Sequence, residues 1–152
     1  FLTALQVGDA FGLGPVGRGL VVMCGGAAAF FASRRIGSMA DRYGTRTVLV
    51  ASSALAAVAL FLLPVAPWAV AAALVWAAAV SAGQGIQATV NLAVINAPGG
   101  SSLISTVQAF RFFGSAAAPV LFLPVYLGIG PAAFWVAAAA LQWINPQRMA
   151  PS

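Results

Sequence analysis

The ten residues from Gly37 to Arg46 read GSMADRYGTR, and they interrupt a chain that is otherwise almost continuously apolar. Most of the charge of the 152-residue chain lies in or just before this stretch. The charged residues of this region are Arg34, Arg35, Asp41, Arg42 and Arg46. A short charged segment between two long apolar runs predicts a water-facing loop between two membrane helices, because the flanks lack the polar outer faces of soluble helices.

The overall composition also predicts a membrane protein. Hydrophobic residues make up 62% of the chain and charged residues 6%, and the mean hydropathy is +0.99. Too few polar side chains remain to cover a soluble surface. The formal net charge of +5 comes from arginines that mostly flank apolar runs, so we interpret them as topology signals. We therefore expect contact with the lipid bilayer and no nucleic-acid partner.

Apolar runs divide residues 1–144 into successive helical segments, which predicts an all-α, polytopic membrane helix bundle. The expected spans are 1–11 (a partial helix), 19–38, 47–64, 68–95, 102–128 and 131–144. The last run is short for a span, and Pro119 and Pro124 should bend or interrupt 102–128 in its second half. Residues 145–152 form a tail after the bundle.

Small residues at helical spacing mark one strip of the segment 19–38. They are Gly26, Ala29, Ser33 and Gly37. Such a strip lets a neighbouring membrane helix approach closely, so we expect it to be a packing face.

The distribution of arginines predicts the orientation of the bundle. If the segment 37–46 faces the cytoplasm, then Arg148 does so too after four further alternations, and Arg18 alone lies in an outward connection. The reverse orientation would violate the positive-inside rule. We expect a multi-pass protein of the plasma (inner) membrane, with the segment 37–46 and the carboxy-terminal tail in the cytoplasm.

Two strips of polar residues lie within the later spans and form a candidate pathway lining. Its residues are Gln84, Gln87, Asn91, Gln108 and Arg111. The serines that share the second strip are Ser101, Ser105 and Ser115. Unpaired amides and charges are costly in lipid, so both strips should face protein or a water-filled cavity. A transport pathway and plain hydrogen bonding between helices both explain them, and Arg111 could also snorkel to the interface.

Enzymatic chemistry finds no support in the sequence. The chain has no histidine or glutamate, the single cysteine Cys24, and the two well-separated aspartates Asp9 and Asp41. Neither a metal site nor a nucleophile with its base can be assembled from this set. We expect no catalytic residues, no metal and no cofactor.

The segment GSMADRYGTR resembles motif A, GxxxDRxGRR, of the major facilitator superfamily of secondary transporters. The matching residues are Gly37, Asp41, Arg42, Gly44 and Arg46. Thr45 stands where the first of the paired basic residues would be. In that family the motif joins the second and third helices of each six-helix half, and the layout of this chain is similar to one half.

Two further stretches favour the carboxy-terminal half of that family. Ser81 stands where the amino-terminal half usually carries the arginine of an RxxQG pattern, and the following residues reach Gly85. The stretch 105–119, STVQAFRFFGSAAAP, resembles the penultimate helix of drug-efflux members. The resemblance implies half of a major facilitator fold, present as a fragment whose partner is the missing amino-terminal half.

The resemblance also implies a function, namely secondary active transport of small molecules by alternating access, with proton-coupled efflux. The motif would be a conformational-switch loop that stabilises the outward-facing state: Gly37 would let its helix pack closely, Asp41 would sit at a helix amino terminus, and Gly44 would supply a turn. No acidic residue lies in the middle of a complete span, so we expect the proton-coupling carboxylate in the absent half, with Asp9 as a weak substitute. The alternative is a non-transporting membrane scaffold or an inactive truncated half-transporter.

Overall fold

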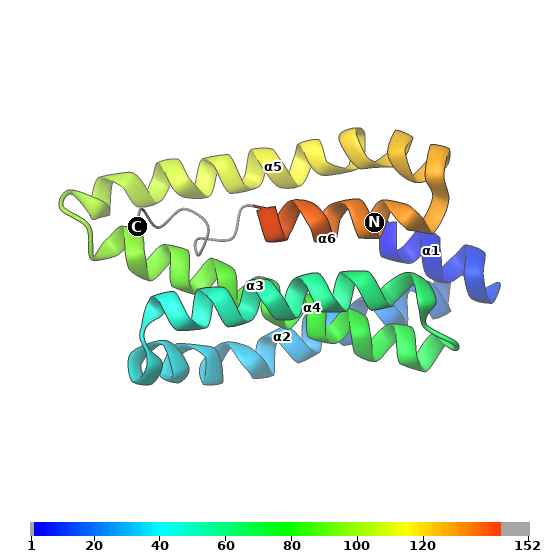
Figure 1. Ribbon diagram of the computed structural model, residues 1–152, viewed down its shortest axis with the longest axis horizontal. Coiled ribbons are helices and arrows are strands. Elements are labelled where there is room, and N and C mark those ends of the chain that lie inside the picture. The colour runs from blue at the N-terminus through cyan, green and yellow to red at the C-terminus, as the bar shows by residue number, and fades with distance from the viewer. Residues whose placement is uncertain (1, 144–152) are drawn as a thin grey trace.

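The computed structural model describes residues 2–143, which form six α-helices and two short 3-10 turns without any strand (Figure 1). The α-helices are α1 (Leu2–Phe11), α2 (Pro15–Tyr43), α3 (Thr45–Leu62), α4 (Ala69–Ile95), α5 (Gly100–Ile129) and α6 (Ala133–Trp143). The short turns are η1 (Leu63–Val65) and η2 (Gly130–Ala132). The predicted all-α bundle is confirmed. The expected tail, 145–152, lies outside the described residues.

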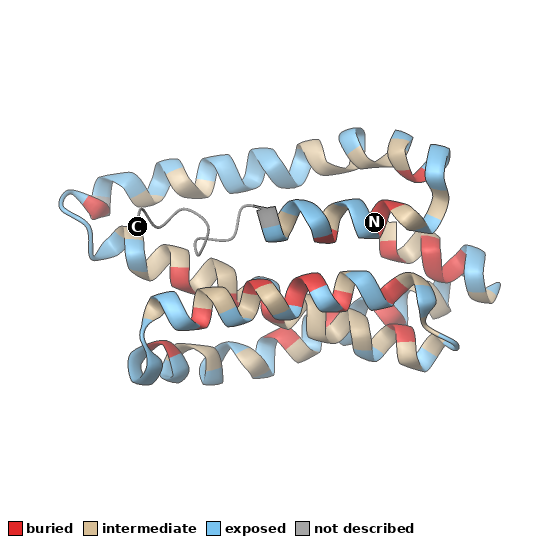
Figure 2. Ribbon diagram, viewed as in Figure 1, coloured by how far each residue is buried: buried red, intermediate tan, exposed pale blue. Residues whose placement is uncertain are grey.

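Four segments within residues 2–143 are long and apolar enough to cross a membrane. They are Pro15–Tyr43, Thr45–Val65, Ala69–Ile95 and Ser102–Gln142, the last of which joins α5 to α6. Large apolar side chains cover much of the outer surface, and Figure 2 shows long exposed stretches on α2 and α5. Such a surface is compatible with contact to lipid tails and costly in water. The chain is thus a membrane protein with an apolar exterior.

Helix α4 packs against both α2 and α3, and α6 packs beside α3. The connections alternate between two ends of the bundle (Figure 1). The α1–α2 connection, η1 and η2 lie together at one end, which we call the η end; Gly44 and the α4–α5 turn lie at the other, which we call the Gly44 end. Arg18 therefore lies near the η end, whereas Arg42 and Arg46 lie at the Gly44 end.

The close approach of α2 to α4 uses a different face of α2 from the one expected. Val21, Gly25 and Ala29 are buried, and a Cβ atom added to Gly25 would lie 2.6 Å from Trp76 Nε1. Apart from Ala29, the predicted strip is not the face that α2 presents to α4, because a Cβ on Gly26 or Gly37 would meet no atom of the described chain within 4 Å. Both strips share Ala29, but one residue of offset turns the helix by about 100°. The Trp76 ring needs a glycine opposite it, and this requirement selects the face.

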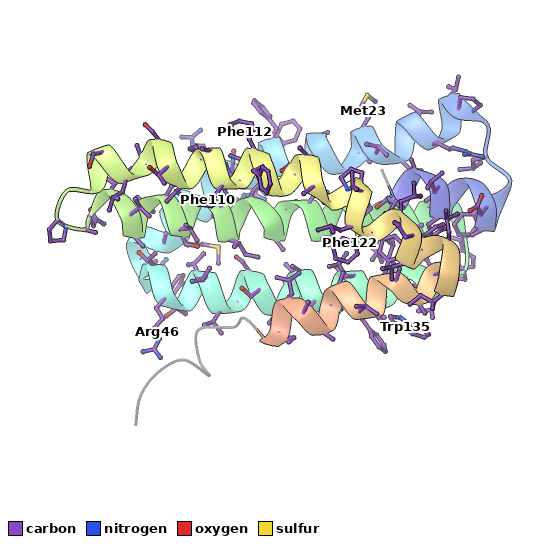
Figure 3. All side chains as sticks on the ribbon, turned by 90° about the horizontal axis from the view of Figure 1, so that it is seen from above. Met23, Arg46, Phe110, Phe112, Phe122 and Trp135 are labelled. Atoms are coloured by element: carbon purple, nitrogen blue, oxygen red, sulfur yellow. The ribbon has the colours of Figure 1, made fainter. Side chains whose placement is uncertain are left out.

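Helix α5 remains continuous through Pro119 and Pro124, so of the two expected effects, a bend or an interruption, the structure shows the bend. Figure 3 shows that α5 changes direction near Phe122 and continues toward η2. A proline removes one backbone donor and crowds the preceding turn, which bends a helix without ending it when neighbours hold it. The bend carries the end of α5 toward α1 and α6, which it contacts.

A buried apolar core cluster lies where α1, η1 and the end of α5 meet α2, α4 and α6. Its buried residues are Val7, Val21, Leu63, Ala72, Tyr126, Ala133 and Phe134. The short helix α6 is also tied to α3, because the indole of Trp135 stacks on Phe61 at 5.7 Å and its Nε1–H donates to the Phe61 carbonyl at 3.1 Å. These contacts hold α5 and α6 against the rest of the bundle at the η end. Toward the Gly44 end, α5 has few neighbours apart from α4.

Candidate functional site

The segment that resembles motif A, residues 37–46, is almost entirely helical. The prediction that it forms a loop is therefore wrong. Helix α2 continues to Tyr43, α3 starts at Thr45, and Gly44 alone joins them. Gly44 has φ +84° and ψ 147°, a conformation that side chains strongly disfavour, and its N–H donates to the Ala40 carbonyl at 3.0 Å. Arginine, methionine and alanine are good helix formers, so the charged residues before Gly44 extend the helix instead of ending it.

Asp41 does not occupy a helix amino terminus, contrary to expectation. It lies in the last turn of α2, where the helix dipole disfavours an anion and favours the neighbouring Arg42. Its side chain is exposed, and it forms no hydrogen bond or ion pair within residues 2–143. The space beside Gly37 is open as well, so no described residue packs against this glycine. Within the described chain, Asp41 and Gly37 of the expected conformational-switch loop therefore have no partner.

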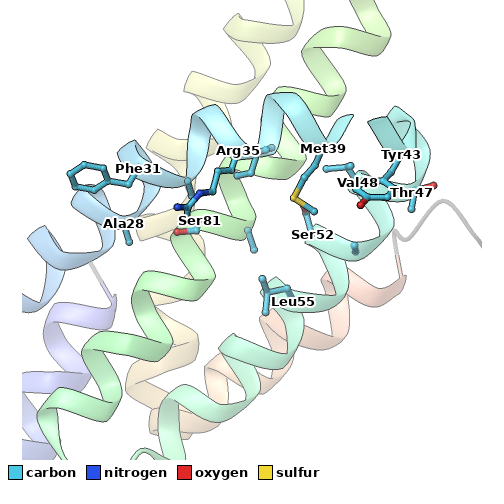
Figure 4. Close-up of a pocket in the computed structure, with 14 residues that line it drawn as sticks. Ala28, Phe31, Arg35, Met39, Tyr43, Thr47, Val48, Ser52, Leu55 and Ser81 are labelled. Carbon is cyan, nitrogen blue, oxygen red and sulfur yellow. The ribbon is translucent and has the colours of Figure 1, made fainter. Parts of the chain in front are cut away.

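An apolar pocket of about 550 Å³ opens where α2 and α3 diverge from Gly44, with α4 at its base (Figure 4). Apolar side chains such as Phe31, Met39 and Leu55 line most of it. Arg35 is the one charged side chain in its lining, and Ser52 and Ser81 contribute hydroxyl groups. From the sequence, Arg35 was interpreted as a topology signal, and its place beside this pocket was not expected. Its position on the same helical face as Phe31 and Met39 was the available signal.

Three of the five candidate lining residues form one hydrogen-bonded chain between α4 and α5. Arg111 Nη1 donates to Gln108 Oε1 at 3.0 Å, and Gln108 Nε2 donates to Asn91 Oδ1 at 3.3 Å. Arg111 is exposed and lies about 16 Å from the start of α5, at 1.5 Å per residue. The Arg111 guanidinium thus lies deep within an apolar segment, where the side-chain amide of Gln108 accepts its hydrogen bond and is itself bonded to Asn91. A charge-assisted hydrogen bond of this kind is worth about 1.5–3 kcal/mol.

The other two candidates, Gln84 and Gln87, lie on α4 but outside this chain. Both side chains are half-buried, and neither forms a hydrogen bond to another described residue. Ser105 and Ser115 are exposed on α5. The structure therefore splits the predicted lining into a connected group of three residues and two separate amides.

The packing of α4 on α3 depends on Gly85, whose contact with α3 was not expected from the sequence. A Cβ atom on Gly85 would collide with the side chain of Ser52, so α3 and α4 lie in close contact there. One turn further on, the buried hydroxyl of Thr89 donates to the Gly85 carbonyl at 2.8 Å. These contacts hold the segment of α4 that carries Gln87 and Asn91. The GQG sequence around Gln84 was the available signal.

The described residues offer no group of three or more His, Cys, Asp or Glu side chains that could hold a metal ion. Comparison with known proteins adds no identification: no family model, no curated protein and no solved structure matches this chain.

Proposed function

We propose that this protein is a secondary active transporter of small molecules that works by alternating access, with proton-coupled efflux as its mode. The resemblance of residues 37–46 to motif A suggests this class, and the chain would work together with a second six-helix bundle of the same kind. In this proposal the Gly44 end faces the cytoplasm and the protein resides in the plasma membrane. The arginines gathered at the Gly44 end support that orientation.

The observation that carries the proposal is the chain of Asn91, Gln108 and Arg111. A guanidinium exposed to lipid this far along an apolar helix would cost several kcal/mol. The face of α5 that carries it must therefore meet water or protein, and binding sites of secondary transporters lie near the membrane midplane between repeats. A cationic lining would favour neutral or anionic substrates.

The unpaired state of Asp41 supports a switch that involves a second body. An exposed carboxylate at the unfavourable end of a helix gains from a cation or helix amino terminus brought to it from outside the bundle. Such a contact would form in one access state and break in the other, which biases the rocking of two bundles.

A non-transporting scaffold is the second candidate, and the exposed aromatic side of α5 favours it. Phe110, Phe112 and Phe113 are 73%, 67% and 73% exposed, so this side could dock another membrane helix without any transport. Packing of helices in lipid requires no polar chain, however. In a scaffold, the chain of Asn91, Gln108 and Arg111 would serve only to join α4 to α5.

Transport can be tested with the full-length protein in liposomes under an imposed pH gradient, with fluorescein as an organic anion probe. We expect dye movement above that of empty liposomes, and a loss of at least about tenfold in Arg111→Gln, because a charge-assisted hydrogen bond is worth more than 1.4 kcal/mol. Arg111→Lys is the matched control that keeps the charge and should retain part of the activity. Equal rates for the wild type and Arg111→Gln would contradict the proposal.

A further inference from the structure

A second polar cluster joins α1 to α5 at the η end of the bundle. The Tyr126 hydroxyl on α5 lies 3.1 Å from Gln6 Oε1 and 3.1 Å from Asp9 Oδ2, both on α1. Gln6 and Tyr126 are only 5% and 7% exposed, whereas Asp9 is exposed. One titratable group open to the surroundings is thus connected to two buried polar groups.

The surroundings of this cluster are apolar. Val7 between the two α1 residues is fully buried, and the ring of Phe134 meets the Tyr126 ring edge-on at 6.4 Å. Buried amides and hydroxyls are costly when unpaired, so Gln6 and Tyr126 depend on each other and on Asp9 for their hydrogen bonds.

The number of hydrogens in the cluster depends on whether Asp9 carries a proton. A tyrosine hydroxyl has one hydrogen, yet Tyr126 Oη has an oxygen acceptor on each side. With Asp9 protonated, its O–H donates to Tyr126 Oη and the Tyr126 O–H donates to Gln6 Oε1, which satisfies every contact. With Asp9 ionised, the Tyr126 O–H must turn to Asp9 Oδ2, and Gln6 keeps a bond only by rotating its amide so that Nε2–H donates to Tyr126 Oη.

We propose that Asp9 is a proton-binding site and that Tyr126 and Gln6 change the direction of their hydrogen bonds with its protonation. A proton taken from water binds the Asp9 carboxylate, and the same proton returns to water on release. Because these hydrogen bonds join α1 to α5, both the binding and the release of the proton alter the contact between the two helices. The further role of this site in coupling protons to transport rests on the proposed function, whereas proton binding does not.

The charged groups near the cluster are few. Arg18 on α2 lies against α1 at Gly8, but its Nε–H donates to the Leu13 carbonyl at 2.7 Å, and it forms no ion pair with Asp9. Helices α4 and α6 carry no ionisable side chain, and Arg111 on α5 lies fifteen residues from Tyr126 in the sequence. Among the described residues, Asp9 therefore has a hydroxyl and no cation as its side-chain partner.

Infrared difference spectroscopy of the protein in liposomes tests proton binding directly. Acidification should produce the C=O stretching band of a carboxylic acid, and the band that Asp9→Asn removes belongs to Asp9. This band should shift in Tyr126→Phe, which deletes only the hydroxyl, and in Gln6→Met, which deletes only the amide. Tyr43→Phe at the Gly44 end is the matched control and should leave the band in place.

Two spectral results would overturn the proposal. An Asp9 band that stays unchanged in both Tyr126→Phe and Gln6→Met would show an isolated surface carboxyl. A band that sodium ions abolish at fixed pH would assign the three oxygens to a metal cation instead of a proton. Retained helical circular dichroism shows that each variant is folded, and Gln6→Met provides the test if Tyr126→Phe loosens the core.

The coupling role has its own measurement with fluorescein in the same liposomes. We expect Asp9→Asn to lose dye movement driven by a pH gradient by at least about fivefold, while dye exchange without a gradient continues. Unchanged gradient-driven movement would overturn the coupling role. Absence of any dye movement in the wild type would count against the proposed transport function and against coupling, and the infrared result would still decide proton binding.

Discussion

Replacing Gly25 by alanine should destabilise the bundle more than the same replacement at any other glycine of α2. The new Cβ would lie 2.6 Å from Trp76 Nε1, 2.8 Å from Trp76 Cδ1 and 3.0 Å from Val80 Cγ2. Comfortable contacts begin near ~3.5 Å, so the two helices must separate by roughly 0.9 Å or the ring must rotate. Overpacking of a formed interface costs about 1–3 kcal/mol. At roughly 2–4 °C per kcal/mol for a chain of this size, Tm should fall by roughly 2–12 °C.

The assay is thermal unfolding of the purified protein in detergent, followed by the loss of helical circular dichroism. Gly26→Ala is the matched control: its Cβ meets no atom within 4 Å, and Tm should not fall. Trp76→Ala should relieve the Gly25→Ala clash, because it removes the whole indole ring, and Trp76 Nε1 has no hydrogen-bond partner to lose. Destabilisation by Gly26→Ala equal to that by Gly25→Ala would refute the deduced packing face.

Three further predictions concern the ends of the bundle. Gly44→Ala should cost about 1–3 kcal/mol in thermal unfolding because φ is +84°, whereas Gly37→Ala, with open space around it, should cost nothing; equal effects would contradict the single-residue turn. Trp135→Phe should cost about 0.5–1.5 kcal/mol through its lost bond to the Phe61 carbonyl, and an unchanged Tm would show that α6 is not held there. In a Cys24→Ser background, Arg46→Cys should react with a membrane-impermeant thiol reagent from the cytoplasmic side and Val16→Cys from the outer side; the opposite pattern would reverse the topology.

The helices could be predicted from the sequence because long apolar runs leave few other structures possible in a membrane. The expected span 68–95 corresponds to α4 at Ala69–Ile95, and 102–128 lies within α5 at Gly100–Ile129. Where charged residues continue a helix, the same rule fails: α2 was expected to end near Ser38 and reaches Tyr43. Hydropathy indicates which residues lie in lipid and which lie in water. It does not show whether the residues in water continue a helix or form a loop.

The contacts between helices could not be predicted in the same way. Helices that are apolar on all sides give no sign of which face is buried, so the choice between Gly25 and Gly26 depended on the unseen Trp76 opposite them. The bond between Gln6 and Tyr126 spans 120 residues and leaves no local pattern. The strip from Gln108 to Arg111 was visible through its helical spacing, but its link to Asn91 needed the relative rotation of α4 and α5.

The central claim is that the face of α5 around Arg111 meets water inside a transport pathway. Arg111→Cys and Phe113→Cys, each in a Cys24→Ser background, place thiols about 200° apart on α5 at nearly the same depth. In native membranes a charged, water-soluble methanethiosulfonate should modify Arg111→Cys rapidly and leave Phe113→Cys unmodified. Equal reactivity at both positions, or none at Arg111→Cys, would contradict the water-lined face and the transport function built on it.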